Sequence, residues 1–143
     1  MTHRIAIDPG VNTGLAVAAS GVLVSVATHT FIEALFAIEA LRTRGWAFEL
    51  VIEDPRGIYV PHGQRNPQRI KGVGSVERDA KLWIEYAEHH GIPYRTVRPG
   101  PYRKIDADTF RRITGWQGRT SEHARAAAMM VFERAATTIP SPR

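Results

Sequence analysis

Short apolar segments alternate with amphipathic ones along most of this chain, and this alternation restricts the fold more than any other feature. Five segments have the composition and spacing of β-strands, and they cover residues 3–8, 13–19, 22–28, 48–52 and 92–97. The first three follow one another closely, and the pair Ser20-Gly21 between the second and the third is typical of a hairpin turn. The sequence therefore predicts three consecutive antiparallel strands, followed by two strands that helices separate.

Helical spacing of apolar residues appears between these strands. It predicts helices over residues 31–43 and 73–87, whose apolar positions fall on one face. Residues 57–68 contain glycine and two prolines, the second of which is Pro67, and we expect them to form a loop.

Two further helices are predicted near the end of the chain. A short helix through residue 113 would be capped by Asp106 or Asp108, which are more plausible as caps than as metal ligands. A last helix would begin at Thr120 or Ser121 and reach about residue 136. The order of elements describes an α/β fold, with one mixed five-stranded sheet flanked by helices.

Length and composition fit one globular domain over residues 1–143. Hydrophobic residues make up 43% of the 143 residues and charged ones 23%, which excludes disordered and collagen-like chains. Cysteine is absent, which excludes thiol chemistry and cysteine-bound zinc. Residues 9–32 lack charged side chains, but Pro9, Gly10 and Gly14 interrupt them, so we expect neither a membrane span nor a signal peptide and predict a cytoplasmic protein.

Positive charge gathers in the second part of the chain. Residues 1–54 have three basic and six acidic side chains, whereas residues 55–143 have sixteen basic and eight acidic ones. Most of these basic residues are arginines, whose guanidinium groups bind phosphate in a bidentate manner. The distribution favours a nucleic-acid partner, and a merely soluble basic surface is the alternative.

Two acidic residues end predicted strands. Asp8 closes the first strand and Glu53 closes the fourth, and both precede a proline-containing turn. If these strands are neighbours, both carboxylates emerge at one edge of the sheet, where α/β proteins commonly hold their ligands. Hard oxygen ligands select Mg²⁺ or Mn²⁺. The alternatives are a turn-capping role for Asp8 and an ion pair between Glu53 and Arg56.

The last predicted helix has His123 in its first turn. Near a helix N-terminus, histidine is biased toward the neutral form, which is the form that binds metal. Taken alone, His123 fits an ordinary surface histidine better. Position 126 faces the same way along the helix, but it is occupied by Ala126.

Three segments together resemble the RuvC family of Holliday junction resolvases, and its small phage-type members in particular. They are residues 5–14 (IAIDPGVNTG), 51–54 (VIED) and 121–128 (SEHARAAA), and the likeness covers nearly the whole chain in order and spacing. This resemblance implies a ribonuclease H-like fold, a homodimer and symmetric cleavage of four-way DNA junctions by phosphodiester hydrolysis with two Mg²⁺ or Mn²⁺ ions.

The resemblance also assigns the candidate catalytic residues. It implies that Asp8 bridges the two metal ions and that Glu53 and His123 are further ligands or orienting groups. The family pattern has an aspartate where this chain has Ala126. A site with one carboxylate fewer is expected to bind one of the ions poorly, which makes the activity of this chain doubtful.

Two explanations account for Ala126. The chain is either an engineered variant in which the acid was removed, or a natural member that lost activity or recruits Glu122. Glu122 is a poor substitute, because adjacent helical residues point about 100° apart.

Candidate DNA-binding residues lie in two basic stretches. They are Arg56, Tyr59, Arg65, Arg69 and Lys71 after Glu53, and Arg103 and Lys104 after the fifth strand. Tyr59 either stacks on an unpaired base or simply packs beneath the loop. The apolar face of the helix over residues 73–87, which includes Trp83, either forms a dimer contact or belongs to the core.

Three other functions compete with a junction resolvase. A sugar-kinase-like or actin-like ATPase has a similar turn after Asp8, but it requires two such domains. A non-catalytic protein that binds branched DNA is compatible with Ala126. A ribonuclease H-like enzyme that processes RNA would use the same acidic residues.

Overall fold

The structure is a computed structural model that describes residues 3–55, 67–100 and 104–134, with side chains from residue 75 onward in the second of these ranges. Five strands form one sheet, namely β1 (His3–Asp8), β2 (Thr13–Ala19), β3 (Val22–His29), β4 (Phe48–Glu53) and β5 (Tyr94–Val97). Their order across the sheet is β3-β2-β1-β4-β5. The first three strands are antiparallel, and β4 and β5 run parallel to β1, so the predicted mixed sheet is confirmed.

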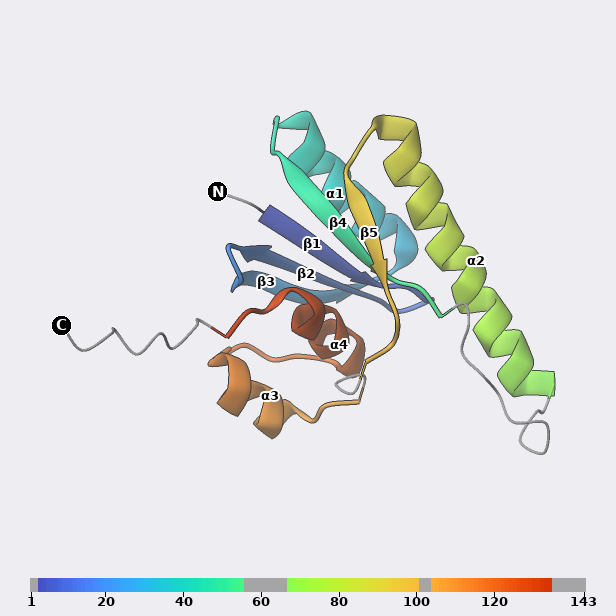
Figure 1. The fold of residues 1–143 in the computed structure, drawn as a ribbon. Coiled ribbons are helices and arrows are strands. Elements are labelled where there is room, and N and C mark those ends of the chain that lie inside the picture. Colours follow the sequence, from blue (N-terminus) through green and yellow to red (C-terminus); the bar gives the residue numbers. More distant parts are fainter. Residues whose placement is uncertain (1–2, 56–66, 101–103, 135–143) are drawn as a thin grey trace.

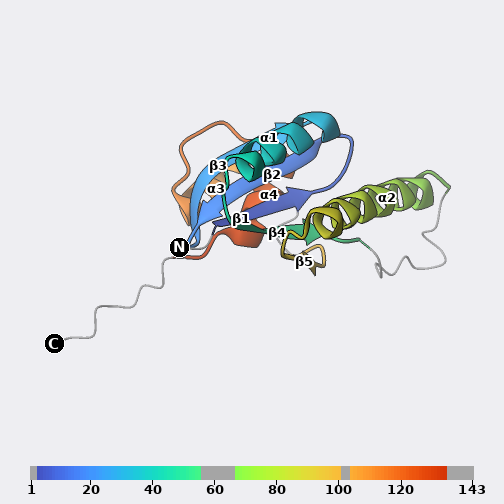
Figure 2. The same cartoon turned by 90° about the horizontal axis from the view of Figure 1, so that it is seen from above.

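Four helices cover the two faces of this sheet (Figures 1 and 2). They are α1 (Phe31–Thr43), α2 (Pro67–His90), α3 (Ala107–Thr114) and α4 (Glu122–Val131). On one face, α1 and α2 enclose a core that includes Ile5, Ile52 and Trp83. On the other, α3 and α4 enclose a second core with Ala6 and Val51 at its centre. Alternate residues of β1 and β4 therefore face opposite helical layers.

Trp83 lies inside the first core, so the core interpretation of its helix face is the correct one. Its side chain is fully buried, and its ring lies 4.9 Å from that of Phe31 and 6.0 Å from that of Tyr86. A residue that the sheet and α1 already cover cannot form a dimer contact. On α2, Leu82 is an apolar side chain that stays exposed.

The bounds of two helices differ from those predicted. α2 begins at Pro67, six residues before the predicted start, because proline has a suitable φ for a first helical turn and needs no N–H there. α4 ends at Val131, well before residue 136. Phe132 is extended, and the N–H of Glu133 donates to the Gly21 carbonyl at 3.0 Å, so the β2–β3 turn captures the chain and ends the helix.

The helix starts follow the sequence signals closely. Thr30 and Glu33 form a reciprocal capping box at α1, and Ser121 accepts the Ala124 N–H at α4. Asp106, rather than Asp108, caps α3, and the Thr109 N–H that it accepts lowers the pKa of its carboxyl group. The cap interpretation of Asp106 is thus confirmed.

A polar contact joins α1 to α2 on the outside of the first core. The Tyr86 hydroxyl donates to Glu39 at 2.5 Å, and Arg42 donates to the same carboxylate at 2.7 Å. The hydrogen bonds from Arg42 and then from Tyr86 lower the pKa of Glu39 to about 2.

None of the helices in the described ranges has the length and hydropathy needed to cross a membrane.

Candidate active site

The carboxyl ends of β1 and β4 bring two acidic residues to one edge of the sheet. Ile7 is aligned with Ile52 in the parallel pairing, so Asp8 and Glu53 come next on adjacent strands. Ala6 and Val51 face α4, and strand alternation therefore directs Asp8 and Glu53 to the same layer. We call this edge, with Asp8 and Glu53, the acidic rim. Both residues are buried, with exposed fractions of 7% and 5%.

His123 reaches the acidic rim from the first turn of α4. Its Nδ1 lies 3.1 Å from Oδ2 of Asp8, although 115 residues separate the two in the sequence. The Asp8 carboxylate is largely enclosed, whereas the imidazole is about half exposed and accessible from solvent. The structure thus brings together two of the three predicted ligands and aligns the third, Glu53, beside Asp8.

Gly14 allows α4 to approach the sheet so closely. It is paired with Asp8 across β1 and β2, and a Cβ atom at this position would lie 2.0 Å from the carbonyl oxygen of His123. No side chain fits in that distance, so the backbone of His123 rests directly on the glycine. The ring of His123 therefore contacts Asp8 of β1, while its carbonyl group packs against Gly14 of β2.

Two further contacts hold the start of α4. The hydroxyl of the capping residue Ser121 forms a hydrogen bond with that of Thr28 on β3. Arg125 donates from Nε to the carbonyl of Ile105 at 2.8 Å and from Nη1 to that of Thr120 at 2.8 Å. The first turn of α4 is thus tied to β1, β2, β3 and the segment before α3.

Ala126 lies in this same helix and is 6% exposed. Its methyl group offers no ligand at the position where the family pattern has an aspartate. Glu122 is exposed at the start of the helix and directly precedes His123, so the two side chains point about 100° apart.

The donor atoms at the acidic rim suit a hard divalent ion in their chemistry. Carboxylate oxygens are ligands for Mg²⁺ or Mn²⁺, whereas an imidazole is a softer ligand. Within the described ranges, however, no group of three or more histidine, aspartate or glutamate side chains is close enough to hold a metal ion. The residue types therefore suit such an ion, whereas the described side chains do not form a site with three ligands.

Most of the candidate DNA-binding residues lie outside the described part of the chain. This holds for Arg56, Tyr59, Arg65 and Arg103, and for the side chains of Arg69 and Lys71, whose backbone belongs to α2. Lys104 is described and exposed. It directly precedes Ile105, whose carbonyl Arg125 holds.

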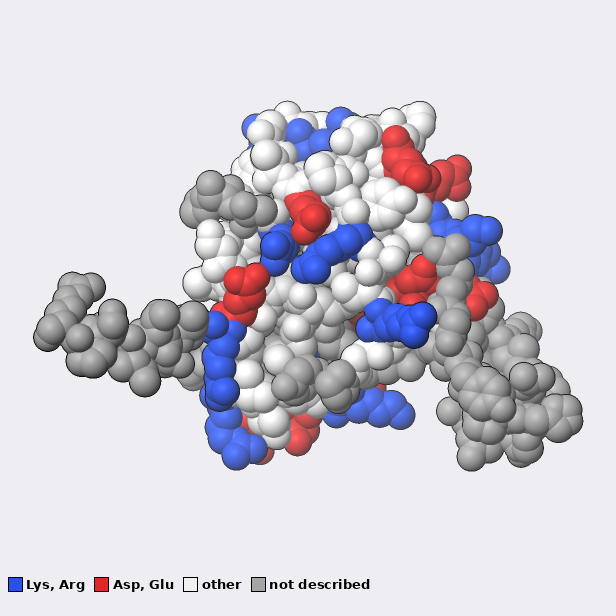
Figure 3. Space-filling model, in the orientation of Figure 1, with Lys and Arg blue, Asp and Glu red and all other residues white. Residues whose placement is uncertain are grey.

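Basic and acidic side chains alternate over the described part of the face in Figure 3. Several of the charged side chains of the protein form ion pairs, since Glu49 pairs with Arg4 at 3.4 Å and with Arg95 at 3.5 Å. Arg4 also pairs with Glu133 at 2.9 Å. These arginines thus have acidic partners within the protein, whereas Lys104 forms no ion pair with any residue that the structure describes.

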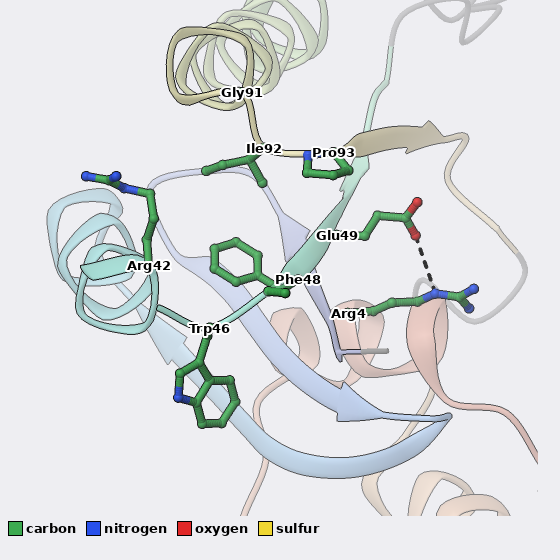
Figure 4. A pocket seen from close by; sticks show the side chains of 9 residues that line it. Arg4, Arg42, Trp46, Phe48, Glu49, Gly91, Ile92 and Pro93 are labelled. Carbon is green, nitrogen blue, oxygen red and sulfur yellow. Dashed lines mark ion pairs between the residues drawn. The ribbon is translucent and has the colours of Figure 1, made fainter. Parts of the chain in front are cut away.

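A cavity of about 550 Å³ lies at the other end of the same strands (Figure 4). Its wall includes Trp46, Phe48, Ile92 and the Arg4–Glu49 ion pair. Residues near the amino ends of β1 and β4 line it, whereas the acidic rim lies at the carboxyl ends of these strands. The two are therefore separate. The cavity and the candidate active site therefore do not coincide.

Sequence reasoning missed three residues that shape this site. Asp54 follows Glu53, is 7% exposed and donates its N–H to Val97 at 2.8 Å. Arg125 and Thr28 secure the start of α4. A charged residue among the buried alanines of α4 was an available signal for Arg125, whereas nothing in the sequence pairs Thr28 with Ser121.

Comparisons with known proteins find likenesses among solved structures. No family model and no curated protein matches the chain. Among solved structures, it is similar to T. thermophilus RuvC in complex with a Holliday junction substrate, with a TM-score of 0.46 and 20% identity over 90% of this chain and 91% of that one. The order and directions of the strands themselves confirm a mixed five-stranded sheet flanked by helices.

Proposed function

We propose that this chain binds four-way DNA junctions and has the site of a divalent-metal-dependent endonuclease of the RuvC type, close to the small phage members. The observation that carries the proposal is the contact of 3.1 Å between Asp8 and His123 at the acidic rim. A strand-end carboxylate and a helical histidine that are far apart in the sequence are joined at the edge where α/β sheets hold ligands.

The site residues have distinct tasks in this proposal. Asp8, Glu53 and His123 would hold the metal ion, which when bound supplies Lewis-acid activation of a phosphodiester and of the attacking water. Asp8 accepts from His123 if Nδ1 carries the proton, and this leaves Nε2 of the imidazole free as a ligand. Basic side chains such as Lys104 would hold the DNA backbone.

Ala126 favours a second candidate, a protein that binds junctions without cleaving them. An alanine that is 6% exposed contributes no charge to the acidic rim. With fewer carboxylates, binding of a second cation is weakened, whereas the contacts of basic side chains with phosphate are unaffected. The two candidates share the substrate and differ in whether the strands are cut.

The test measures binding and cleavage of a synthetic four-way junction separately, in Ca²⁺ and in Mg²⁺, for the original chain and for Ala126→Asp. We expect both proteins to bind the junction in preference to linear duplex. We expect Ala126→Asp to cleave at least about a hundredfold faster in Mg²⁺, because removing or restoring one charge-stabilising group typically changes such rates by that order.

Matched variants separate the site from a general effect of charge. Ala40→Asp places the same change on an exposed position of α1 and should not alter cleavage, whereas Asp8→Asn in the Ala126→Asp protein should abolish it. Equal cleavage by the original chain and Ala126→Asp would contradict the role given to position 126. A preference for structured RNA over the junction would refute the DNA substrate.

The proposal includes a homodimer, because two sites related by a two-fold axis can nick a four-way junction symmetrically. The burial of Trp83 excludes a dimer contact at that residue, which was one of the two alternatives for its helix face. Light scattering of the protein with and without the junction measures the stoichiometry, and one monomer per junction would refute the symmetric arrangement.

A further inference from the structure

Arg125 joins three segments through main-chain atoms. Its guanidinium donates to the carbonyl of Ile105, to that of Thr120 and, at 3.1 Å, to the hydroxyl of Thr120. Ile105 and Thr120 stand on either side of residues 106–119, which include α3. A single side chain of α4 thus holds both ends of the 106–119 segment together.

The chemistry of this contact requires a guanidinium. Two carbonyl groups that belong to different segments each receive an N–H at 2.8 Å, and a planar group with several fixed donors can satisfy both at once. A lysine ammonium donates from a single nitrogen and cannot reproduce the separate positions of Nε and Nη1. Arg125 forms no ion pair with a carboxylate of the described residues, so its charge is satisfied by main-chain oxygens.

The contact also fixes the relative positions of two functional groups. Lys104 is exposed and directly precedes Ile105, one of the residues that Arg125 holds. His123 lies two residues before Arg125 in α4 and contacts Asp8. The Arg125 guanidinium therefore connects the segment that contains Lys104 to the turn of α4 that contains His123.

We infer that Arg125 is a positioning residue, which sets the distance between the phosphate-binding Lys104 and the Asp8–His123 pair. The inference rests on the proposed function, because it assumes that Lys104 contacts the DNA backbone. It adds that Arg125 acts on DNA through Lys104 and does not itself contact phosphate.

A double-mutant cycle on junction affinity tests the inference. The proteins are Arg125→Gln, Lys104→Gln, the double variant and the charge-conserving Arg125→Lys, with Arg44→Gln at an exposed site on the far end of α1 as control. We expect each of the first two changes to weaken binding about fivefold to tenfold, as the loss of one phosphate contact does. The double variant should bind as Lys104→Gln does, because Arg125 acts through the lysine.

Arg125→Lys keeps the charge but cannot bridge the two carbonyls, so it should bind as weakly as Arg125→Gln. Wild-type affinity of Arg125→Lys, or additive effects in the double variant, would overturn the inference. Hydrogen exchange provides a measurement without DNA. Amides of residues 106–119 should exchange faster in both Arg125 variants while those of β1 stay protected, and unchanged exchange in this segment would also overturn it.

Failure of the proposed function gives a different result. In that case the original chain would bind the four-way junction no better than linear duplex, whatever residue is present at position 125. The exchange measurement would still show whether Arg125 holds the 106–119 segment.

Discussion

Replacing Gly14 with alanine should separate the two halves of the candidate active site. The added Cβ would lie 2.0 Å from the His123 carbonyl oxygen and 2.5 Å from its carbon, whereas ordinary contact begins near 3.4 Å. The first turn of α4 must therefore move away from β2 by about 1.4 Å, the difference between 3.4 and 2.0 Å. Both sides of this contact are backbone, so no flexible side chain can absorb the movement.

The cost should resemble that of overpacking a core, about 1–3 kcal/mol. For a chain of this size it corresponds to a decrease in Tm of roughly 3–12 °C. The movement also withdraws His123 from Asp8, which is 3.1 Å away in the structure, and misplacement by about 1 Å can reduce catalysis a hundredfold.

Calorimetry gives the loss of stability, and amide chemical shifts of residues 121–126 report the movement of α4. Gly100→Ala is the matched control, because no described atom lies within 4 Å of a Cβ at Gly100. It should neither lower the Tm nor change the amide shifts of α4. If Gly14→Ala kept the Tm and the amide shifts of the original chain, the close approach of α4 to β2 would be refuted.

Two further predictions concern the helix contacts. Ser121→Ala removes the cap of α4 and the hydrogen bond to Thr28, and urea unfolding should show a loss of about 0.5–2 kcal/mol; no loss would contradict the cap. The pKa of Glu39 is lowered from 4.5 to about 2, so its stabilising contribution is complete above pH 4.5 and is lost as the pH falls toward 2. Tyr86→Phe removes one of the causes and should flatten this acid dependence in thermal unfolding; an unchanged slope would contradict the contact.

The strands and helix starts could be predicted because their signals are local. Alternation of apolar residues gives β1 and β2 with the bounds that the structure has, and Ser121 and Asp106 cap helices as their side chains suggest. The end of α4 could not be predicted in this way. It depends on the hydrogen bond from Glu133 to Gly21, a residue more than a hundred positions away.

In the candidate site, too, features with local sequence signals could be predicted, whereas contacts between distant segments could not. The positions of Asp8 and Glu53 at strand ends are visible in the sequence, and the parallel pairing of β1 with β4 places them on one edge. The hydrogen bonds of Arg125 depend on how α4 packs against the segment before α3, and they have no counterpart in residue spacing. Likewise, Gly14 is recognisable as part of a turn motif, but its contact with the backbone of His123 requires the tertiary structure.

The strand β1 has different tasks at its two ends. Arg4, near its amino end, joins Glu49 and Glu133 beside the cavity, whereas Asp8 lies at the acidic rim. Four residues of extended chain separate them by about 13 Å. Under the proposed function, a fluorescent label or surface tether attached near Trp46 would lie at the opposite end of β1 from the candidate site. This end of the molecule is therefore suited to attachment in single-molecule tests of junction binding.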